Sequence, residues 1–134
     1  MSFEYRQKVL FKHCDPAGIV FFPRYFEMMN DCVEAYFDEV LGVPFETLHT
    51  THAVPTAAIE TRFRAPSRHG DILTLTLTPQ HLGRTSWRYE MSAHCEGETR
   101  FATVATLVHV NAQGKPTAWP DELADKLKGC DDRS

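Results

Sequence analysis

The sequence predicts an α+β fold in which one long helix lies against an antiparallel sheet of about five strands. Two patterns lead to this fold class. In one long segment, apolar residues recur at steps of three and four, which is the period of an amphipathic helix. In several shorter segments, apolar and polar residues alternate, which is the period of a half-buried strand. A length of 134 residues suits one folding unit, so we expect a single domain over residues 1–134.

Composition and charge argue against several classes of protein. Hydrophobic residues make up 43% of the chain and charged residues 24%, which is ordinary for a globular protein. The formal net charge of −4 provides no broad basic face, so we expect no nucleic-acid partner. Residues 1–6 lack a signal-peptide pattern, and no apolar run approaches the ~20 residues of a membrane span. The four cysteines are scattered, as in proteins with reduced thiols, so we expect a cytoplasmic protein without membrane association.

The first half of the chain is expected to hold one strand and the long helix. Residues 3–11 read as a strand, and residues 13–18 form a polar segment with proline and glycine, which favour turns. Pro23 suits the first helical turn, where its missing N–H costs nothing, and Gly42 suits the helix exit. The apolar stripe of the helix consists of Phe22, Phe26, Met29, Val33, Tyr36, Phe37 and Val40.

The second half is expected to supply the rest of the sheet. Residues 57–64, 73–78 and 87–93 alternate between apolar and polar, and residues 101–110 are apolar on both faces apart from threonines and His109. Short turns at residues 82–84 and 96–98 would join the last three strands into an antiparallel meander, and residues 120–127 would form a short helix. One helix cannot cover both sides of such a sheet. We therefore expect a homo-oligomer that buries the uncovered edge or face.

The candidate active site lies between residues 13 and 26. Asp15 stands in a loop with proline and glycine, just ahead of the predicted helix. At a helix start the backbone N–H groups lack intrahelical acceptors and carry a partial positive charge, so they can hold a carbonyl oxygen that gains negative charge. A carboxylate beside them can attack that carbonyl or activate water. The alternative is that Asp15 only forms a turn or caps the helix.

Residues 13–26, HCDPAGIVFFPRYF in one-letter code, resemble the signature of the 4-hydroxybenzoyl-CoA thioesterase family. A looser likeness extends over most of the chain through residues 63–66 (FRAP) and 70–71 (GD). The resemblance implies a hotdog fold, in which the sheet wraps the long helix. It also implies that subunits join their sheets edge to edge, usually as dimers of dimers, and hold coenzyme A at an interface. The implied reaction is hydrolysis of an acyl-CoA to free acid and coenzyme A.

The same resemblance implies roles for individual residues. Asp15 falls on the family's catalytic aspartate, which acts as nucleophile or general base. Phe22 falls where a backbone N–H polarises the thioester carbonyl, and Gly18 and Pro23 shape that approach. Tyr25 belongs to the motif either as a substrate contact or as a packing residue.

The residues that would select the substrate depart from the family pattern. Relatives that act on the hydroxylated aromatic thioester carry an acid where this chain has Asn30, which is neutral but can still donate and accept hydrogen bonds. The family's basic turn for the coenzyme A phosphates is reduced to residues 82–86, where Arg84 is the best phosphate contact, with Thr85 and Ser86 beside it. Reserve cations are Arg62, Arg64 and Arg88. We expect an aromatic, 4-hydroxybenzoyl-like acyl group or a short-to-medium acyl chain.

Other chemistries find less support. None of the seven histidines has the spacing of a zinc or H-E-x-x-H site, so we expect no metal and no cofactor besides the coenzyme A of the substrate. His13 is expected to tune Asp15 or to contact coenzyme A, and Cys14 to pack. The chain lacks the G-x-S-x-G pattern of a serine hydrolase. A hotdog dehydratase or isomerase and a non-catalytic acyl-CoA-binding module remain as alternatives.

Overall fold

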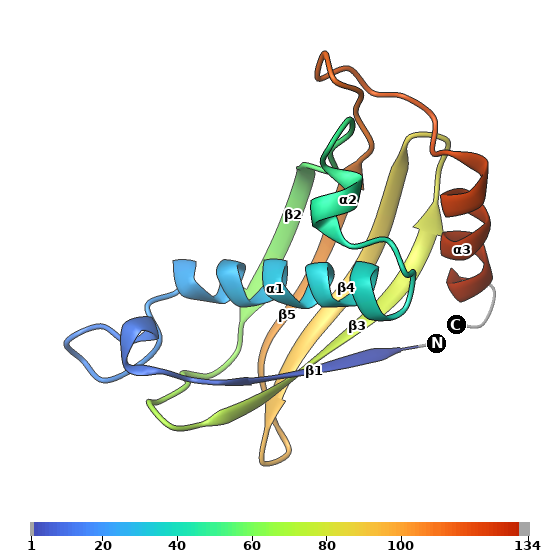
Figure 1. Ribbon diagram of the computed structural model, residues 1–134. Helices are drawn as coiled ribbons and strands as arrows, with labels where there is room; N and C mark the ends of the chain where they lie inside the picture. The colour runs from blue at the N-terminus through green and yellow to red at the C-terminus, as the bar shows by residue number, and fades with distance from the viewer. Residues whose placement is uncertain (1, 132–134) are drawn as a thin grey trace.

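The computed structural model describes residues 2–131, which form five strands, three α-helices and one short 3-10 helix (Figure 1). In chain order the elements are β1 (Phe3–Lys8), η1 (Phe11–His13), α1 (Pro23–Glu39), α2 (Phe45–Leu48), β2 (Thr56–Phe63), β3 (Ile72–Leu82), β4 (Ser86–Cys95), β5 (Glu98–Val108) and α3 (Asp121–Asp131). This order confirms the α+β class, with a strand, the long helix and then four strands.

The five strands form one antiparallel sheet in the order β1-β3-β4-β5-β2. The expected meander is present as β3, β4 and β5. β1 and β2 are the edge strands. Along β3 the alternation of the sequence becomes a difference in burial: Leu73, Leu75 and Leu77 are fully buried, while the threonines between them are half-buried. The leucines therefore define the inner face of the sheet, which is the face toward α1.

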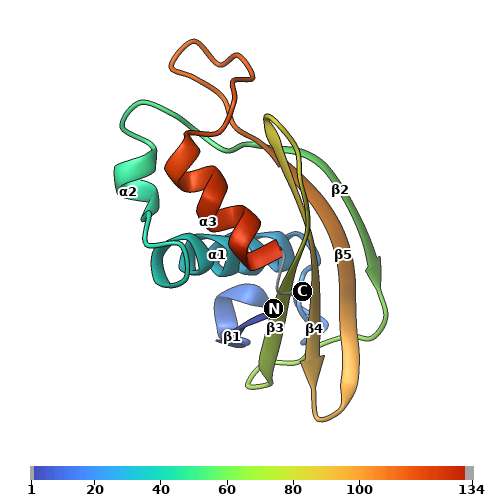
Figure 2. The same ribbon diagram turned by 90° about the vertical axis from the view of Figure 1, so that its right-hand side faces the viewer.

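All three α-helices lie on the inner side of the sheet, and α1 crosses it (Figure 2). Most of the predicted apolar stripe of α1 lies in the core: Met29, Val33, Tyr36 and Phe37 are buried, Phe26 and Val40 are partly buried, and Phe22 at the N-cap is exposed. α3 packs against β3. Trp87 of β4 is fully buried; its ring stacks on Tyr36 at 5.5 Å and meets Phe37 edge-on at 5.9 Å. Large aromatic side chains bury much apolar area each, so these contacts stabilise the core. No helix within residues 2–131 has both the length and the apolar character needed to span a membrane.

The structure differs from the sequence-based prediction in the bounds of several elements and in two short helices, η1 and α2. β1 ends at Lys8 instead of residue 11, because the chain turns into η1, where the Leu10 N–H donates to His13 Nδ1 at 2.9 Å. α2 was not predicted, since four residues are too few to show a helical period. β3 continues past Pro79 to Leu82 through a register shift. Such a shift accommodates a proline, which has no N–H to donate.

β2 is an exposed edge of the sheet. All of its residues except Thr61 are exposed, including two large apolar side chains of the inner face, Ile59 at 43% and Phe63 at 46%. On one side β2 pairs with β5, and its other side has no partner strand among the described residues. A strand with an open, partly apolar edge can pair with another chain.

Candidate active site

Asp15 lies in a loop that its own backbone hydrogen bonds close; we call residues 13–21 the aspartate loop. The Asp15 N–H donates to Ile19 O, and the Gly18 N–H to Asp15 O, both at 2.9 Å. At the base of the loop the Phe21 N–H donates to His13 O at 2.9 Å. Gly18 has φ +83°, a conformation that glycine adopts without strain. The loop therefore holds Asp15 on one flank and leads directly into α1 on the other.

The carboxylate of Asp15 is half-buried and only partly engaged. Its Oδ1 accepts the Ala17 N–H at 2.9 Å, which is a turn-forming interaction. Within residues 2–131, Oδ2 has no hydrogen-bond partner. The role of turn former thus accounts for one oxygen and leaves the other available to a ligand.

The start of α1 offers one free backbone donor, the N–H of Phe22. Phe22 is the N-cap residue, and Pro23 after it has no N–H. The next two donors are used, because the Arg24 N–H bonds Phe21 O at 2.8 Å and the Tyr25 N–H bonds Phe22 O at 3.0 Å. Among the described residues, nothing accepts a hydrogen bond from the Phe22 N–H. The helix dipole adds partial positive charge at this point.

Asp15 and Phe22 are connected through the backbone of the aspartate loop. Cys14 pairs with Val20 across the aspartate loop, and Asp15 lies opposite Ile19, three residues before Phe22. Both groups therefore border the same loop, one on each flank.

His13 and Cys14 support the aspartate loop from inside. His13 is buried, and because its Nδ1 accepts the Leu10 N–H, the ring proton is on Nε2. Burial lowers the pKa of His13 below its ordinary value of 6.5, and the charge of Lys12 lowers it further. The Cys14 thiol donates to Leu10 O at 3.6 Å. The substrate contact expected of His13 stays a prediction.

A shallow hollow of about 260 Å³ adjoins the helix start. It is lined by residues 19, 20, 22 and 25 on one side and residues 63–66 on the other, so the aspartate loop and the end of β2 share it. The rings of Phe22 and Phe63 meet here at 5.8 Å, with Phe22 55% exposed. Arg64, exposed on the rim, brings a positive charge to this hollow.

A larger cavity of about 620 Å³ lies between α1, α2 and the inner face of β2, β4 and β5. Its wall is mostly apolar, with polar groups from Asn30, His49 and Tyr89. Burial raises the pKa of the Tyr89 hydroxyl, which therefore stays protonated at neutral pH. Phe26 lines this cavity and contacts Phe22 at 6.5 Å, so an aromatic contact links it with the smaller hollow. This volume is in the usual range for a small-molecule site.

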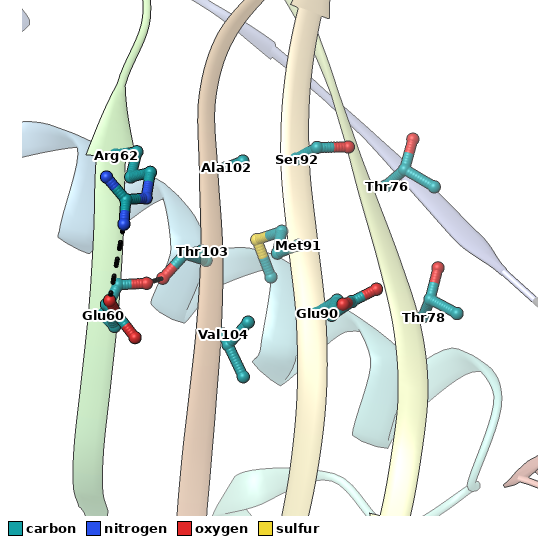
Figure 3. Close-up of a pocket in the computed structure, with 10 residues that line it drawn as sticks. All are labelled: Glu60, Arg62, Thr76, Thr78, Glu90, Met91, Ser92, Ala102, Thr103 and Val104. Carbon is teal, nitrogen blue, oxygen red and sulfur yellow. Dashed lines mark hydrogen bonds and ion pairs between the residues drawn. The ribbon is translucent and has the colours of Figure 1, made fainter.

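A third hollow, of about 460 Å³, lies on the opposite, outer face of the sheet (Figure 3). Its side chains include Thr76, Thr78 and Glu90, together with an exposed pair, Glu60 and Arg62, at 4.0 Å. It contains none of the residues of the aspartate loop and no helix start. This outer hollow is therefore separate from Asp15 and the start of α1.

The predicted phosphate turn is at the other end of the sheet from the aspartate loop. Arg84 O and Thr85 O accept N–H groups of Trp119 and His109, at 3.1 and 2.7 Å. The aspartate loop instead pairs with Arg68, which precedes the start of β3. The 11 residues of β3 separate these two ends by about 35 Å, at about 3.3 Å per residue. Within one chain the structure does not bring Arg84, Thr85 and Ser86 together with Asp15.

The sequence-based prediction missed a buried polar cluster beneath the aspartate loop, made of Ser67, Asp71 and Arg100. Arg100 is the charged residue among the buried polar side chains of the described chain, and it pairs with Asp71 at 2.8 Å. The available signal was an arginine at the start of the apolar run that forms β5.

Within residues 2–131, no three histidine, cysteine or acidic side chains gather as a metal site would require.

Comparisons with known proteins identify the family and the fold of the chain. A family model for the Thioesterase-like superfamily matches residues 9–127. A 1,4-dihydroxy-2-naphthoyl-CoA hydrolase from Thermosynechococcus vestitus is 31% identical over 107 residues, which cover 77% of this chain and 71% of that protein. The structure of a 1,4-dihydroxy-2-naphthoyl-CoA thioesterase from Synechocystis superposes with a TM-score of 0.88, at 18% identity over 98% of both chains. A gentisyl-coenzyme A thioesterase superposes with 0.83, at 24% identity over 90% of this chain and 98% of that one.

These relatives confirm that the chain belongs to the predicted superfamily, but they correct the family predicted within it. The similar proteins are named for naphthoyl and gentisyl thioesters, whereas the sequence motif had suggested the 4-hydroxybenzoyl-CoA thioesterases. The solved structures also confirm the expected hotdog fold. The chain belongs to the Thioesterase-like superfamily and is a hotdog-fold thioesterase.

Proposed function

We propose that the protein hydrolyses an aryl-CoA thioester, with Asp15 and the Phe22 N–H as its reacting groups. The observation that carries this proposal is the pair of unused groups on the two flanks of the aspartate loop: Asp15 Oδ2 and the Phe22 N–H. The amide binds the carbonyl oxygen and stabilises the negative charge that develops on it. Loss of one such donor typically costs a factor of about 10²–10³ in rate.

Two routes are open to the carboxylate. Asp15 can attack the carbonyl carbon, which expels the thiolate of coenzyme A and leaves an acyl-aspartyl anhydride that water then hydrolyses. Alternatively, Asp15 takes a proton from a water molecule that attacks the same carbon. In both routes the carbon–sulfur bond breaks, and the products are a free acid and coenzyme A.

The acyl group occupies the cavity between α1, α2 and the sheet. Its mostly apolar wall suits an aromatic ring, and Asn30, His49 and Tyr89 can hydrogen-bond ring hydroxyls. His49 has one ring nitrogen on Phe45 O at 2.9 Å, so its other nitrogen is left for a ligand. The relatives named above act on dihydroxylated aromatic thioesters, which match this combination of surfaces. A hydroxylated aromatic acid is accordingly the preferred acyl group.

The working unit is a homodimer formed through β2, with a tetramer built from two dimers. Thr56 of β2 shares one rung of the sheet with Leu107, Trp87 and Leu82, so the start of β2 lies at the same end as the phosphate turn. Antiparallel pairing of two β2 strands about a twofold axis places that end beside the partner's aspartate loop. Arg84 of the partner subunit, with its neighbouring turn, then binds the coenzyme A phosphates of this chain's substrate.

A thiol-release screen tests the proposal. The wild type should liberate coenzyme A from hydroxylated aryl-CoA esters faster than from alkyl-CoA esters, and Asp15→Ala should abolish release while it keeps the fold and the oligomer. An Asp15→Ala variant with full activity would refute the role of the carboxylate. Hydration of an enoyl-CoA without thiol release would favour the dehydratase, and tight ester binding without turnover would favour the binding module.

A further inference from the structure

One residue, Ser67, holds the chain on both sides of Phe22. Its carbonyl oxygen accepts the N–H of Val20, two residues before Phe22, at 2.9 Å. Its hydroxyl oxygen accepts the hydroxyl of Tyr25, three residues after Phe22, at 2.9 Å. Ser67 and Tyr25 are both buried. The direction of the Phe22 N–H is thus set from the loop between β2 and β3, a part of the chain more than 40 residues away.

Ser67 is itself fixed by Arg100 of β5. Nη1 of Arg100 donates to Ser67 Oγ at 3.2 Å, to Pro66 O at 3.1 Å and to Asp71 Oδ2 at 2.8 Å, and its Nε lies 2.9 Å from Glu98 Oε1. The backbone carbonyl of Arg100 accepts N–H groups from residues 64 and 65 at 2.8 and 3.3 Å. The side chain and the backbone carbonyl of Arg100 therefore both hold the short segment that carries Ser67.

The charge of Arg100 is balanced within the protein. Its side chain is 8% exposed, and Asp71 faces it at 2.8 Å. Hydrogen bonds from the Arg68 N–H and from Arg100 hold the pKa of Asp71 below its ordinary range. Burial costs the Arg100 charge its hydration, and the ion pair with Asp71, whose side chain stays 30% exposed, only offsets this cost. The cluster is therefore better explained by the need to hold Ser67 in a fixed position than by a gain in the free energy of unfolding.

We infer that Ser67, Arg100 and Tyr25 are positioning residues that aim the Phe22 N–H at the thioester carbonyl. Arg100 fixes Ser67, and Ser67 fixes the two chain segments that flank Phe22. None of the three needs to touch the reacting atoms. The inference rests on the proposed function, because it assigns a purpose to the donor that the proposed reaction uses.

Tyr25→Phe tests the inference with the smallest change. It removes the bond to Ser67 and keeps the ring, which packs on Phe63 and Phe101 at 5.8 and 5.1 Å. We expect kcat to fall about tenfold or more with KM nearly unchanged, because a misplacement of about 1 Å can cost up to about 100-fold in rate. Tyr36→Phe is the matched control: it removes a buried hydroxyl three turns further along the same helix and should retain wild-type activity.

A spectroscopic measurement separates positioning from a general loss of structure. The infrared carbonyl stretch of a ¹³C-labelled benzoyl-CoA bound to Asp15→Asn reports how strongly the protein polarises the thioester. In Asp15→Asn the stretch should lie below its value in solution, and in Asp15→Asn with Tyr25→Phe it should move back toward that value. Ser67→Ala, which removes both contacts of the hydroxyl, should move it at least as far.

The outcomes distinguish this inference from the proposed function. Wild-type protein that releases no thiol from any ester would overturn both. An active wild type whose Tyr25→Phe variant keeps its kcat and carbonyl frequency would overturn the inference alone. The inference alone also fails if Tyr25→Phe lowers only the melting temperature, to the same degree as Tyr36→Phe.

Discussion

The inner side of the aspartate loop rests on the imidazole of His13, two residues before Asp15, the proposed catalytic residue. Its Nδ1 accepts the Leu10 N–H, while its carbonyl accepts the Phe21 N–H at the base of the loop. His13 belongs to the sequence motif, but the sequence does not show which of its ring nitrogens accepts the Leu10 N–H. That choice depends on η1, whose three residues are too short to leave a periodic pattern. His13 can therefore affect activity by holding the shape of the loop that carries Asp15.

This arrangement predicts acid sensitivity that originates at His13. Its pKa in the folded protein is below the ordinary 6.5, so between these two values the unfolded chain binds more protons than the folded one. The contribution of His13 to stability is therefore complete above pH 6.5 and is lost as the pH falls toward the folded pKa. His13→Asn, whose side-chain oxygen can still accept the Leu10 N–H, should remove this component.

Urea unfolding at a series of pH values measures the effect. Below pH 6.5 the free energy of unfolding of the wild type should fall more steeply than that of His13→Asn, by at most about 1.4 kcal/mol per pH unit for one proton. Other titrating groups are common to both proteins and cancel in the difference. Parallel curves for the two proteins would show that His13 does not sense the pH.

At the scale of elements, the long helix and the strands could be predicted because their periods extend over many residues. α1 begins at Pro23 as expected, and the meander of β3, β4 and β5 has the expected turns. The buried cluster around Arg100 could not be predicted in this way. Its partners come from β5 and from the loop between β2 and β3, and only the folded sheet brings them together. Side-chain periodicity reports burial within one element and carries no information on such contacts.

The start of α1 yields a prediction that separates its backbone donor from its side chain. Phe22 has φ −52°, which a proline can adopt, so Phe22→Pro removes the N–H with little change of the dihedral angle. Phe22→Ala removes the exposed ring and keeps the N–H. We expect Phe22→Pro to lose a factor of about 10²–10³ in kcat relative to Phe22→Ala, as for loss of one oxyanion donor.

Steady-state thiol release by the two variants tests this comparison, with circular dichroism as the check on α1. Equal kcat values for Phe22→Pro and Phe22→Ala, with helix content preserved in both, would contradict the use of this amide. A loss confined to KM would instead assign Phe22 to ground-state binding of the substrate.

At the scale of the whole molecule, the sheet has one well-covered face, and its β2 edge is exposed. α1, α2 and α3 lie over the inner face (Figure 2). On β2 both Ile59 and Phe63 are exposed, and the Phe63 ring contacts Phe22 at the helix start. Apolar side chains on an unpaired edge strand favour association with a second chain. A single subunit also keeps its phosphate turn at the far end of β3 from Asp15. A twofold dimer through β2 would both cover the exposed edge and bring the predicted phosphate turn of one subunit near Asp15 of the other.

This dimer predicts that assembly and activity are lost together. Ile59→Lys places a charge in the proposed interface and also in the wall of the acyl cavity, so light scattering should show monomers. Thiol release should fall at least tenfold at low substrate, because a partner's turn no longer holds coenzyme A. Ile72→Lys is the matched control: Ile72 is also an apolar strand residue, is 54% exposed, and lies near the opposite edge, where β3 pairs with β1. It should leave both properties unchanged. An Ile59→Lys monomer with full activity would mean that one chain holds a complete site, and the coenzyme A phosphates would then have to bind cations near the aspartate loop, such as Arg64.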